Sequence, residues 1–172
     1  MLISEDYREQ QKQLHKNPNY GVASVEFAPI VTALINQLQV TDILDYGAGK
    51  GRLGDSIQPD HEVKMSRYDP AVPGWDEKPD SAQLVCSIDV LEHIEPELID
   101  NVLDDLQGLV EFFGFFTIHT GPAKKVLSDG RNAHLIQEGP EYWLPKLLER
   151  FELQAFQKTP NGFYVLVKRL WQ

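Results

Sequence analysis

The chain has 172 residues, with 16 lysines and arginines against 26 aspartates and glutamates, so its net charge is −10. This length predicts one domain, and a hydrophobic fraction of 42% excludes a disordered or collagen-like chain. The acidic balance argues against bulk nucleic-acid binding, which depends on lysine and arginine contacts to phosphates. A local basic patch at Lys124, Lys125 and Arg131 is compatible with it.

No stretch of the sequence approaches the roughly 18 to 20 consecutive apolar residues of a membrane helix, so we expect no membrane association. Residues 1–6 show neither a basic leader nor an apolar signal segment. Cys86 is the single cysteine, which excludes an intrachain disulfide and a CxxC metal site. These features predict a reduced, cytoplasmic setting.

The chain begins with a polar stretch that we expect to behave differently from the rest. Residues 1–22 predict an N-terminal arm or lid on a single domain whose core is 23–172. Within the arm, residues 4–20 have only Tyr7, Leu14 and Tyr20 as sizeable apolar or aromatic groups, which predicts a loosely attached helix. From Val25 to Leu38, apolar residues recur at helical spacing, with Pro29 placed near the first turn.

Short β-branched and apolar runs then alternate with helical patterns. We predict strands at 40–46, 63–68, 82–88 and 115–119, a helix from Pro96 to Gly114, a short helix near 123–128, a helix from about 139 to 150, and a closing hairpin of 151–157 and 163–168. The alternation predicts a Rossmann-like α/β fold with helices on both faces of a mostly parallel sheet. The C-terminal antiparallel hairpin makes that sheet mixed.

The chemistry of the chain concentrates where the first predicted strand ends. Asp45 precedes glycines at 47, 49 and 51, and Asp69 follows the second strand, twenty residues after Gly49. Such a carboxylate accepts hydrogen bonds from ribose hydroxyls. Asp45 would repel the pyrophosphate of a dinucleotide and suits a cationic ligand such as S-adenosylmethionine. Arg52 stands where a dinucleotide motif needs its third glycine, which disfavours a nicotinamide-dependent oxidoreductase.

Several ordered segments resemble the class I S-adenosylmethionine-dependent methyltransferases. Asp45 to Gly51 resembles their glycine-rich first motif, Tyr68-Asp69-Pro70 their acidic second motif, and Ala82 to Ile94 their fourth-strand segment. His134-Leu135-Ile136 is similar to the segment after their fifth strand. The resemblance spans residues 25–168.

The resemblance implies a cofactor site. Asp45 would help to hold the ammonium group of S-adenosylmethionine, and Asp69 would bind its ribose. The remaining implied cofactor contacts are Gly47, Ala48 and Gly49 beneath the amino-acid part, Pro70 and Ala71 beside the adenine, and Ser87, Ile88 and Asp89 along the methionine side.

The sequence departs from the family between Asp69 and Ala82. Only twelve residues separate them, too few for the helix and strand that members usually have there. We therefore expect one edge strand and its helix to be missing, with Trp75 or Pro79 substituting beside the adenine.

Methyl transfer needs alignment of nucleophile and methyl group, and a general base only where the acceptor carries a proton. His93, His119 and His134 are the candidate catalytic residues, although a lone histidine is more often structural. We predict methyl transfer to an O or N nucleophile of a small-molecule acceptor, bound by the arm and the 119–140 loop. A non-catalytic partner protein that only binds S-adenosylmethionine is the main alternative.

A metal site is a further alternative. The set Asp89, Glu92, His93 and His134 resembles the metal ligands of small-RNA 2′-O-methyltransferases and of ubiquinone-pathway O-methyltransferases. Carboxylate and imidazole ligands suit Mg²⁺, Mn²⁺ or Zn²⁺, so a metal-assisted RNA-end methyltransferase stays open. The Glu-His-Ile sequence also occurs in members without a metal, so the pattern alone does not favour one.

Overall fold

A mixed sheet forms the centre of the protein in the computed structural model, which describes residues 1–17 and 21–170. Its strand order is β2-β1-β3-β4-β6-β5. The elements in chain order are α1 (Glu5–His15), α2 (Ala23–Leu38), β1 (Asp42–Tyr46), α3 (Arg52–Ser56), β2 (Lys64–Tyr68), β3 (Ala82–Ile88), α4 (Ile99–Leu109), β4 (Val110–His119), α5 (Pro140–Leu148), β5 (Phe151–Thr159) and β6 (Gly162–Arg169).

The first four strands in this sheet run parallel, and the last two form an antiparallel hairpin. β1 pairs in parallel with both β2 and β3, and β3 pairs in parallel with β4. β6 then pairs antiparallel with β4 and with β5. The Rossmann-like mixed sheet predicted from the sequence is confirmed. Because the parallel strands share one direction, their carboxyl ends lie at one edge of the sheet, where ligands of such folds bind.

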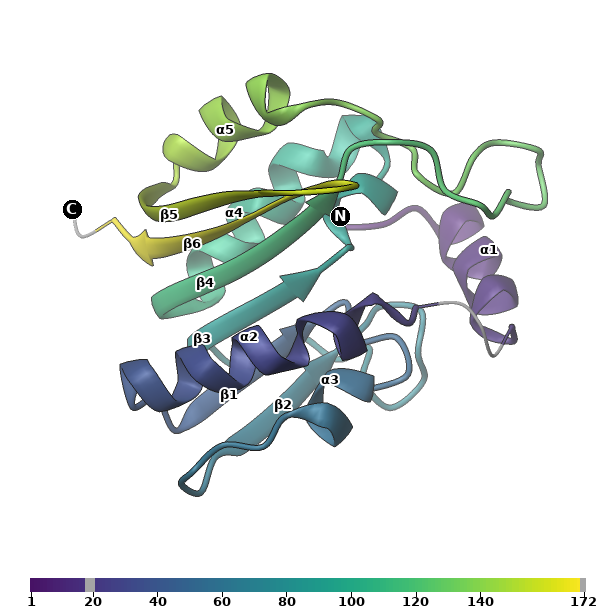
Figure 1. Cartoon of the computed structure of the whole chain (residues 1–172). Coiled ribbons are helices and arrows are strands. Elements are labelled where there is room, and N and C mark those ends of the chain that lie inside the picture. The colour runs from purple at the N-terminus through teal and green to yellow at the C-terminus, as the bar shows by residue number, and fades with distance from the viewer. Residues whose placement is uncertain (18–20, 171–172) are drawn as a thin grey trace.

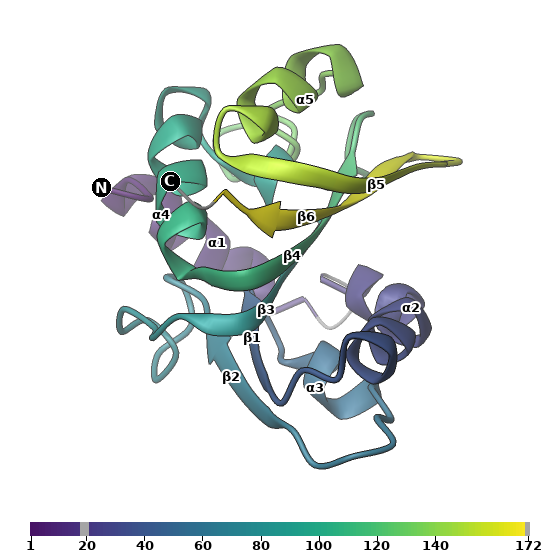
Figure 2. The same cartoon turned by 90° about the vertical axis from the view of Figure 1, so that its left-hand side faces the viewer.

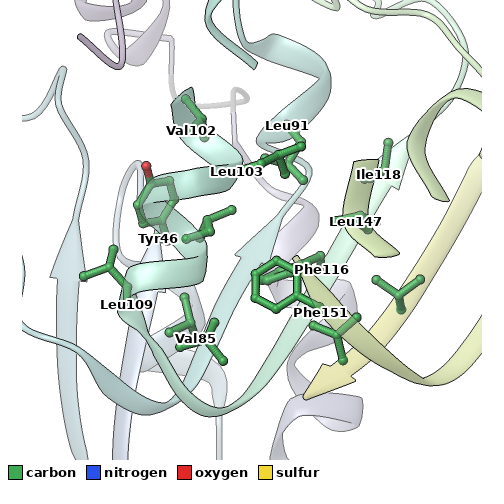
Figure 3. Packing of buried hydrophobic residues seen from close by; sticks show 14 of the residues in the cluster. Tyr46, Val85, Leu91, Val102, Leu103, Leu109, Phe116, Ile118, Leu147 and Phe151 are labelled. Carbon is green, nitrogen blue, oxygen red and sulfur yellow. The ribbon is translucent and has the colours of Figure 1, made fainter. Parts of the chain in front are cut away.

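Helices cover both faces of the sheet (Figures 1 and 2). α2 packs on one face, where Val31 and Ile35 are fully buried against β1 and β3 residues. α4 and α5 pack on the other face. Figure 3 shows this second core, in which Leu103 of α4 and Leu147 of α5 lie among strand residues such as Phe116. The two apolar layers explain why β3 and β4 are apolar on both sides.

The sheet is short on one side. β2 is an edge strand, and residues 69–81, which connect it to β3, consist of turns without a helix or strand. Trp75 folds this segment back: its carbonyl accepts from the Asp69 N–H at 2.9 Å, and its ring stacks with Arg67, 5.3 Å from the guanidinium carbon.

The helix predicted from Pro96 to Gly114 is wrong at its C-terminal end. α4 stops at Leu109, and Val110 already begins β4, paired with Ala82 of β3. Phe113 continues this register opposite Leu84, so pairing with β3 overrides the helical periodicity. Gly114 lies inside the strand, where an added Cβ would meet the Phe116 ring at 2.5 Å.

Two smaller expectations are also wrong. No helix forms at 123–128; instead Val126 and Asn132 make an isolated antiparallel bridge. Pro29 lies in the second turn of α2 rather than the first, because the helix already begins at Ala23. Leu38 ends that helix as expected.

The N-terminal arm is packed firmly, contrary to the loose attachment expected from its polarity. Ser4 caps α1 by accepting from the Tyr7 N–H, and the Ser4 N–H and hydroxyl both donate to Glu95, at 2.8 and 2.6 Å. The Tyr7 side chain is 2% exposed, and its hydroxyl donates to the His93 carbonyl. Tyr20, the third aromatic or apolar residue of the arm, lies outside the described residues.

Across residues 1–17 and 21–170, no helix combines the length and the apolar character that a membrane crossing requires.

The buried layer under α4 gives a test of the fold. Leu103 has no exposed surface, so we expect Leu103→Ala to lower the free energy of unfolding by about 2 to 5 kcal/mol through lost burial and a residual cavity. Leu148 is 48% exposed, and Leu148→Ala is the matched control, with an expected change within about 0.5 kcal/mol. Urea denaturation of the two variants measures both values. Equal losses would contradict this packing.

Candidate active site

The glycine turn after β1 is held against the end of β2. The Gly47 and Ala48 N–H groups both donate to the Tyr68 carbonyl, at 2.8 and 3.0 Å. Gly47 adopts a φ of +78°, and an added Cβ there would lie 2.4 Å from a Val90 methyl group. Only glycine meets both demands, so the turn brings bare backbone to the carboxyl edge of the sheet.

Asp69 joins this turn to the loop after β2. One carboxylate oxygen accepts from the Gly49 N–H and the other from the Ala71 N–H, each at 2.9 Å. The side chain is buried at 6% exposure, yet it lines the main cavity together with Pro70. Each carboxylate oxygen has a second lone pair, so this fixed carboxylate can still accept hydroxyl groups from a ligand.

Asp45 is a buried carboxylate directly under the cavity. Its side chain is 4% exposed, and burial raises its pKa to about 7, with Asp69 adding to the rise and Arg67 opposing it. Keeping such a group charged at neutral pH costs free energy unless a cation lies nearby. The position therefore favours a positively charged ligand.

Helix α1 forms the wall opposite the glycine turn. The His15 ring lies 3.3 Å from where a Cβ on Gly49 would be, and its Nε2 is 4.0 Å from the Asp69 carboxylate. Burial lowers the His15 pKa, against the raising effect of Asp69. Just beyond the helix, the Lys50 ammonium donates to the Asn17 carbonyl. The end of α1 thus lies beside the expected cofactor site; a lid function of the arm stays a prediction.

These walls enclose a cavity of about 870 Å³, within the range of roughly 300 to 1,000 Å³ that is common for small-molecule sites. Most of its lining comes from α1 and the residues on either side of it, the glycine turn, the loop after β2, the segment after β3, and the loop after β4. Val102 of α4 and the turn between β5 and β6 complete it. The predicted cofactor residues on its surface are Asp45, Gly47, Ala48, Gly49, Asp69, Pro70, Ala71, Ile88 and Asp89.

Ser87 is the predicted cofactor residue that does not line the cavity. It has no exposed surface, and its hydroxyl oxygen has no hydrogen-bond partner among the described residues. Trp75 and Pro79, expected beside the adenine, are also absent from the described cavity lining. The segment that carries them folds back toward Arg67 instead.

Asp89 holds the end of β3 in an unusual conformation. Its φ is +51°, and its N–H donates to the Thr117 carbonyl and hydroxyl, while the Thr117 hydroxyl donates to its carboxylate at 2.5 Å. Burial raises the Asp89 pKa, and the Thr117 hydrogen bond opposes the rise. Backbone strain of this kind clusters at functional sites.

The three candidate catalytic histidines meet at one place on the cavity wall. The His134 ring lies 4.6 Å from the His93 ring and 4.7 Å from the His119 ring, between centroids. Burial lowers the pKa of His93 to about 3 and also lowers that of His134. At neutral pH His93 and His134 are therefore uncharged.

A hydrogen bond fixes the proton position on His134. Its Nδ1 lies 2.7 Å from the Gly121 carbonyl, which only accepts, so Nδ1 carries the proton and Nε2 keeps a free lone pair. His119 Nδ1 lies near both the Gly121 N–H, at 3.1 Å, and the Gly121 carbonyl, at 3.2 Å, so both tautomers of His119 find a partner there. Of these two histidines, His134 is the one arranged as a base.

Glu92 lies behind the histidines and is fully buried. One of its oxygens accepts from the His119 N–H at 3.0 Å, and the other has no partner within the described part of the chain. Burial raises its pKa well above the ordinary range. Ligand atoms of Glu92, His93 and His134 lie within 4.8 Å of one another, whereas Asp89 is not part of this group. An orphaned carboxylate oxygen beside two imidazoles fits a divalent metal.

The three residues of the predicted basic patch, Lys124, Lys125 and Arg131, do not share one environment. Arg131 pairs with Asp129 at 2.8 Å and is not among the residues that line the cavity. Lys124 and Lys125 both line the cavity.

Sequence reasoning missed the role of Gln11 and His15 and understated that of Tyr7. Tyr7, Gln11 and Leu14 recur at helical spacing, and this stripe faces the body of the protein, with the Gln11 amide donating to the Tyr7 hydroxyl. The stripe was visible in the sequence. The partners of α1 were not: the His93 carbonyl, which accepts from Tyr7, and Glu95, which accepts from Ser4, lie more than eighty residues away.

Comparison with known proteins identifies the fold. Neither protein-family models nor curated proteins match the chain. Solved structures do match the chain. The 1,6-didemethyltoxoflavin-N1-methyltransferase of Burkholderia thailandensis, with 1,6-didemethyltoxoflavin and S-adenosylhomocysteine bound, matches with a TM-score of 0.62 and 18% identity, covering 98% of this chain and 91% of that one.

Two further solved structures are of methyltransferases whose names indicate very different substrates. The magnesium protoporphyrin IX methyltransferase of Synechocystis PCC 6803, with S-adenosylhomocysteine bound, matches with a TM-score of 0.55 and 12% identity over 95% of this chain and 94% of that one. The 16S rRNA methylase ArmA matches at 0.57 and 16%, over 95% and 91%. The chain therefore has the class I methyltransferase fold, and these identities carry no further assignment.

The raised pKa of Asp45 gives a pH test of the site. Between its ordinary value of 3.8 and about 7, the folded state binds a proton that the unfolded state has released, so Asp45 lowers stability as pH rises. We expect Asp45→Asn to be more stable than the wild type at about pH 8, with a smaller difference at about pH 5, the slope being at most about 1.4 kcal/mol per pH unit. Urea denaturation at both pH values measures the difference.

Asp80→Asn is the control, because Asp80 is exposed. We expect its effect on stability to be similar at both pH values. If the effect of Asp45→Asn on stability is also the same at both pH values, the Asp45 carboxyl does not have the raised pKa described above.

Proposed function

We propose that this protein is an S-adenosylmethionine-dependent methyltransferase that transfers a methyl group to an O or N nucleophile of a small-molecule acceptor. One observation carries the proposal: Asp45, the bare glycine turn and Asp69 lie along one wall of a cavity that continues to the histidine cluster. A cation, a ribose and a nucleophile each find suitable groups there.

Different residues of the cavity lining would have different roles in the reaction. Asp45 lies where it would stabilise the positive charge of the cofactor, and Asp69 where it would accept the ribose hydroxyls. The bound cofactor supplies an activated methyl group. Ile88, Asp89 and Val90 follow in the same cavity lining, and the acceptor would lie next to His134. α1 and the loop after β4 would exclude water.

His134 would take the proton of an acceptor that carries one. His134 lines the cavity, and its Nε2 lone pair is left for the acceptor because the Nδ1 proton is donated to the Gly121 carbonyl. The lowered pKa keeps it unprotonated at neutral pH. His119 and His93 pack against its ring and hold its orientation, which is how positioned bases gain efficiency.

Asp69→Asn tests the cofactor site. Asparagine keeps one oxygen for the backbone contacts but loses the negative charge, so we expect S-adenosylhomocysteine to stabilise the wild type and to stabilise the variant much less. At about a hundred times its Kd a ligand adds about 2.7 kcal/mol. Thermal unfolding, with each variant compared with its own ligand-free sample, measures this.

NADH is the control ligand in the same experiment. Stabilisation by NADH rather than by S-adenosylhomocysteine would contradict the proposal and favour an oxidoreductase. Binding of S-adenosylhomocysteine without methyl transfer from labelled S-adenosylmethionine to any of a broad set of acceptors would favour the non-catalytic partner protein.

A second candidate, metal-assisted methyl transfer, is favoured by the convergence of Glu92, His93 and His134. The unpartnered Glu92 oxygen and the His134 Nε2 lone pair are the donors that a divalent ion would take. The ion would help to deprotonate an acceptor hydroxyl, such as the ribose hydroxyl of an RNA end.

If the metal-assisted candidate holds, EDTA abolishes activity, Mg²⁺, Mn²⁺ or Zn²⁺ restores it, and Mn²⁺ binds the wild type in isothermal titration. Glu92→Gln keeps the acceptor for the His119 N–H but removes the charge, so we expect it to lose Mn²⁺ binding. Glu141→Gln, on an exposed site, should retain it. Full activity in EDTA would eliminate this candidate and leave the first one intact.

A further inference from the structure

The loop between β4 and α5 is a built structure rather than a solvated connection. The Asn132 side chain accepts from the Ala123 and His134 N–H groups and donates to the Ala123 carbonyl, each at 2.9 Å. The Ala133 N–H bonds the Lys125 carbonyl at 3.0 Å, and Val126 bridges to Asn132. These contacts fix residues 123–126 relative to His134.

The same loop is packed against the body of the protein. Leu127 is 3% exposed and lies in a cluster with Tyr7 of α1 and Ala133. Gln10 of α1 also donates to Asp129 at 3.1 Å. Figure 1 shows the loop, in green, beside α1 at one end of the sheet. Lys124 and Lys125 are therefore presented from a rigid support.

The positive charges of the loop differ in whether a carboxylate neutralises them. Arg131 is neutralised by Asp129, but neither Lys124 nor Lys125 has a carboxylate within salt-bridge distance among the described residues. Both lysines line the cavity, whereas Arg131 does not. Both ammonium groups are therefore left for a ligand in the cavity.

The acidic and basic residues of the cavity lining come from different segments. Asp45, Asp69 and Asp89 lie at the ends of β1, β2 and β3, whereas the two lysines lie in the loop after β4, which also carries His134. The net charge of −10 repels anions at long range, but interactions beyond about 10 Å are screened at ordinary salt. The two nearby lysines therefore determine whether an anion is attracted into this part of the cavity.

We propose that the acceptor carries an oxyanion group, a carboxylate or a phosphate, which Lys124 and Lys125 bind while the nucleophile lies beside His134. The inference rests on the proposed function and names its substrate class. Gly121, which holds His134, and Lys124 are three residues apart, at most about 11 Å of extended chain. One small molecule can touch both.

The experiment measures anion binding directly. Isothermal titration compares benzoate, phenyl phosphate and the neutral benzamide on the wild type and on the Lys124→Gln/Lys125→Gln double variant, with and without S-adenosylhomocysteine. We expect at least one anion to bind the wild type more tightly than benzamide does, and to bind the double variant about tenfold more weakly. The stronger of the two anions identifies the carboxylate or the phosphate.

The control is Lys78→Gln/Lys158→Gln, which removes the same charge from two exposed lysines outside the cavity lining. We expect it to keep the wild-type affinity. An equal loss in both double variants, an affinity for benzamide that matches the anions, or no anion binding to the wild type would each overturn the inference.

The test separates this inference from the proposed function. If S-adenosylhomocysteine does not bind but the lysine-dependent anion preference persists without it, the methyltransferase proposal fails and the oxyanion site stands. If S-adenosylhomocysteine binds and the preference is absent, the reverse holds. Thermal unfolding without ligand checks that each double variant is folded.

Discussion

The carboxylate of Asp69 is the constraint on which the site depends. It accepts one N–H from the glycine turn after β1 and one from the loop after β2, so it fixes two chain segments that carry no regular structure. The parallel pairing of β1 with β2 brings these segments together, ending with Tyr46 opposite Tyr68. Because the pairing and the carboxylate act on the same edge, the backbone that faces the ligand is already in place before a ligand arrives, which lowers the ordering cost of binding.

Closure by α1 gives this edge a second wall. His15 lies over Gly49 and beside Asp69, so a ligand that reaches the carboxylate also meets the imidazole. Contacts hold α1 along its whole length: Ser4 bonds Glu95 at its start, Gln10 donates to Asp129 in its middle, and His15 lies beside Asp69 at its end. The helix is therefore a fixed wall of the cavity.

The sequence predicts the parts of the molecule that depend on local order. The glycine turn, Asp69 and the strand ends follow from short motifs, and the alternation of elements is enough for the sheet. The end of α4 could not be predicted, because Val110 and Phe113 fit a helix and a strand equally well until β3 is placed beside them. The attachment of α1 and the meeting of His93, His119 and His134 rest on contacts between residues far apart in the chain, which periodicity does not contain.

The short connection between β2 and β3 changes which element completes the cavity. With turns alone in residues 69–81, the chain has no helix there to cover the ligand next to Asp69, and Trp75 turns back to Arg67. α1 supplies cover on the opposite side through Gln11 and His15. The same helix reaches the loop after β4 through Gln10 and Tyr7, so one element borders both the acidic and the basic end of the cavity.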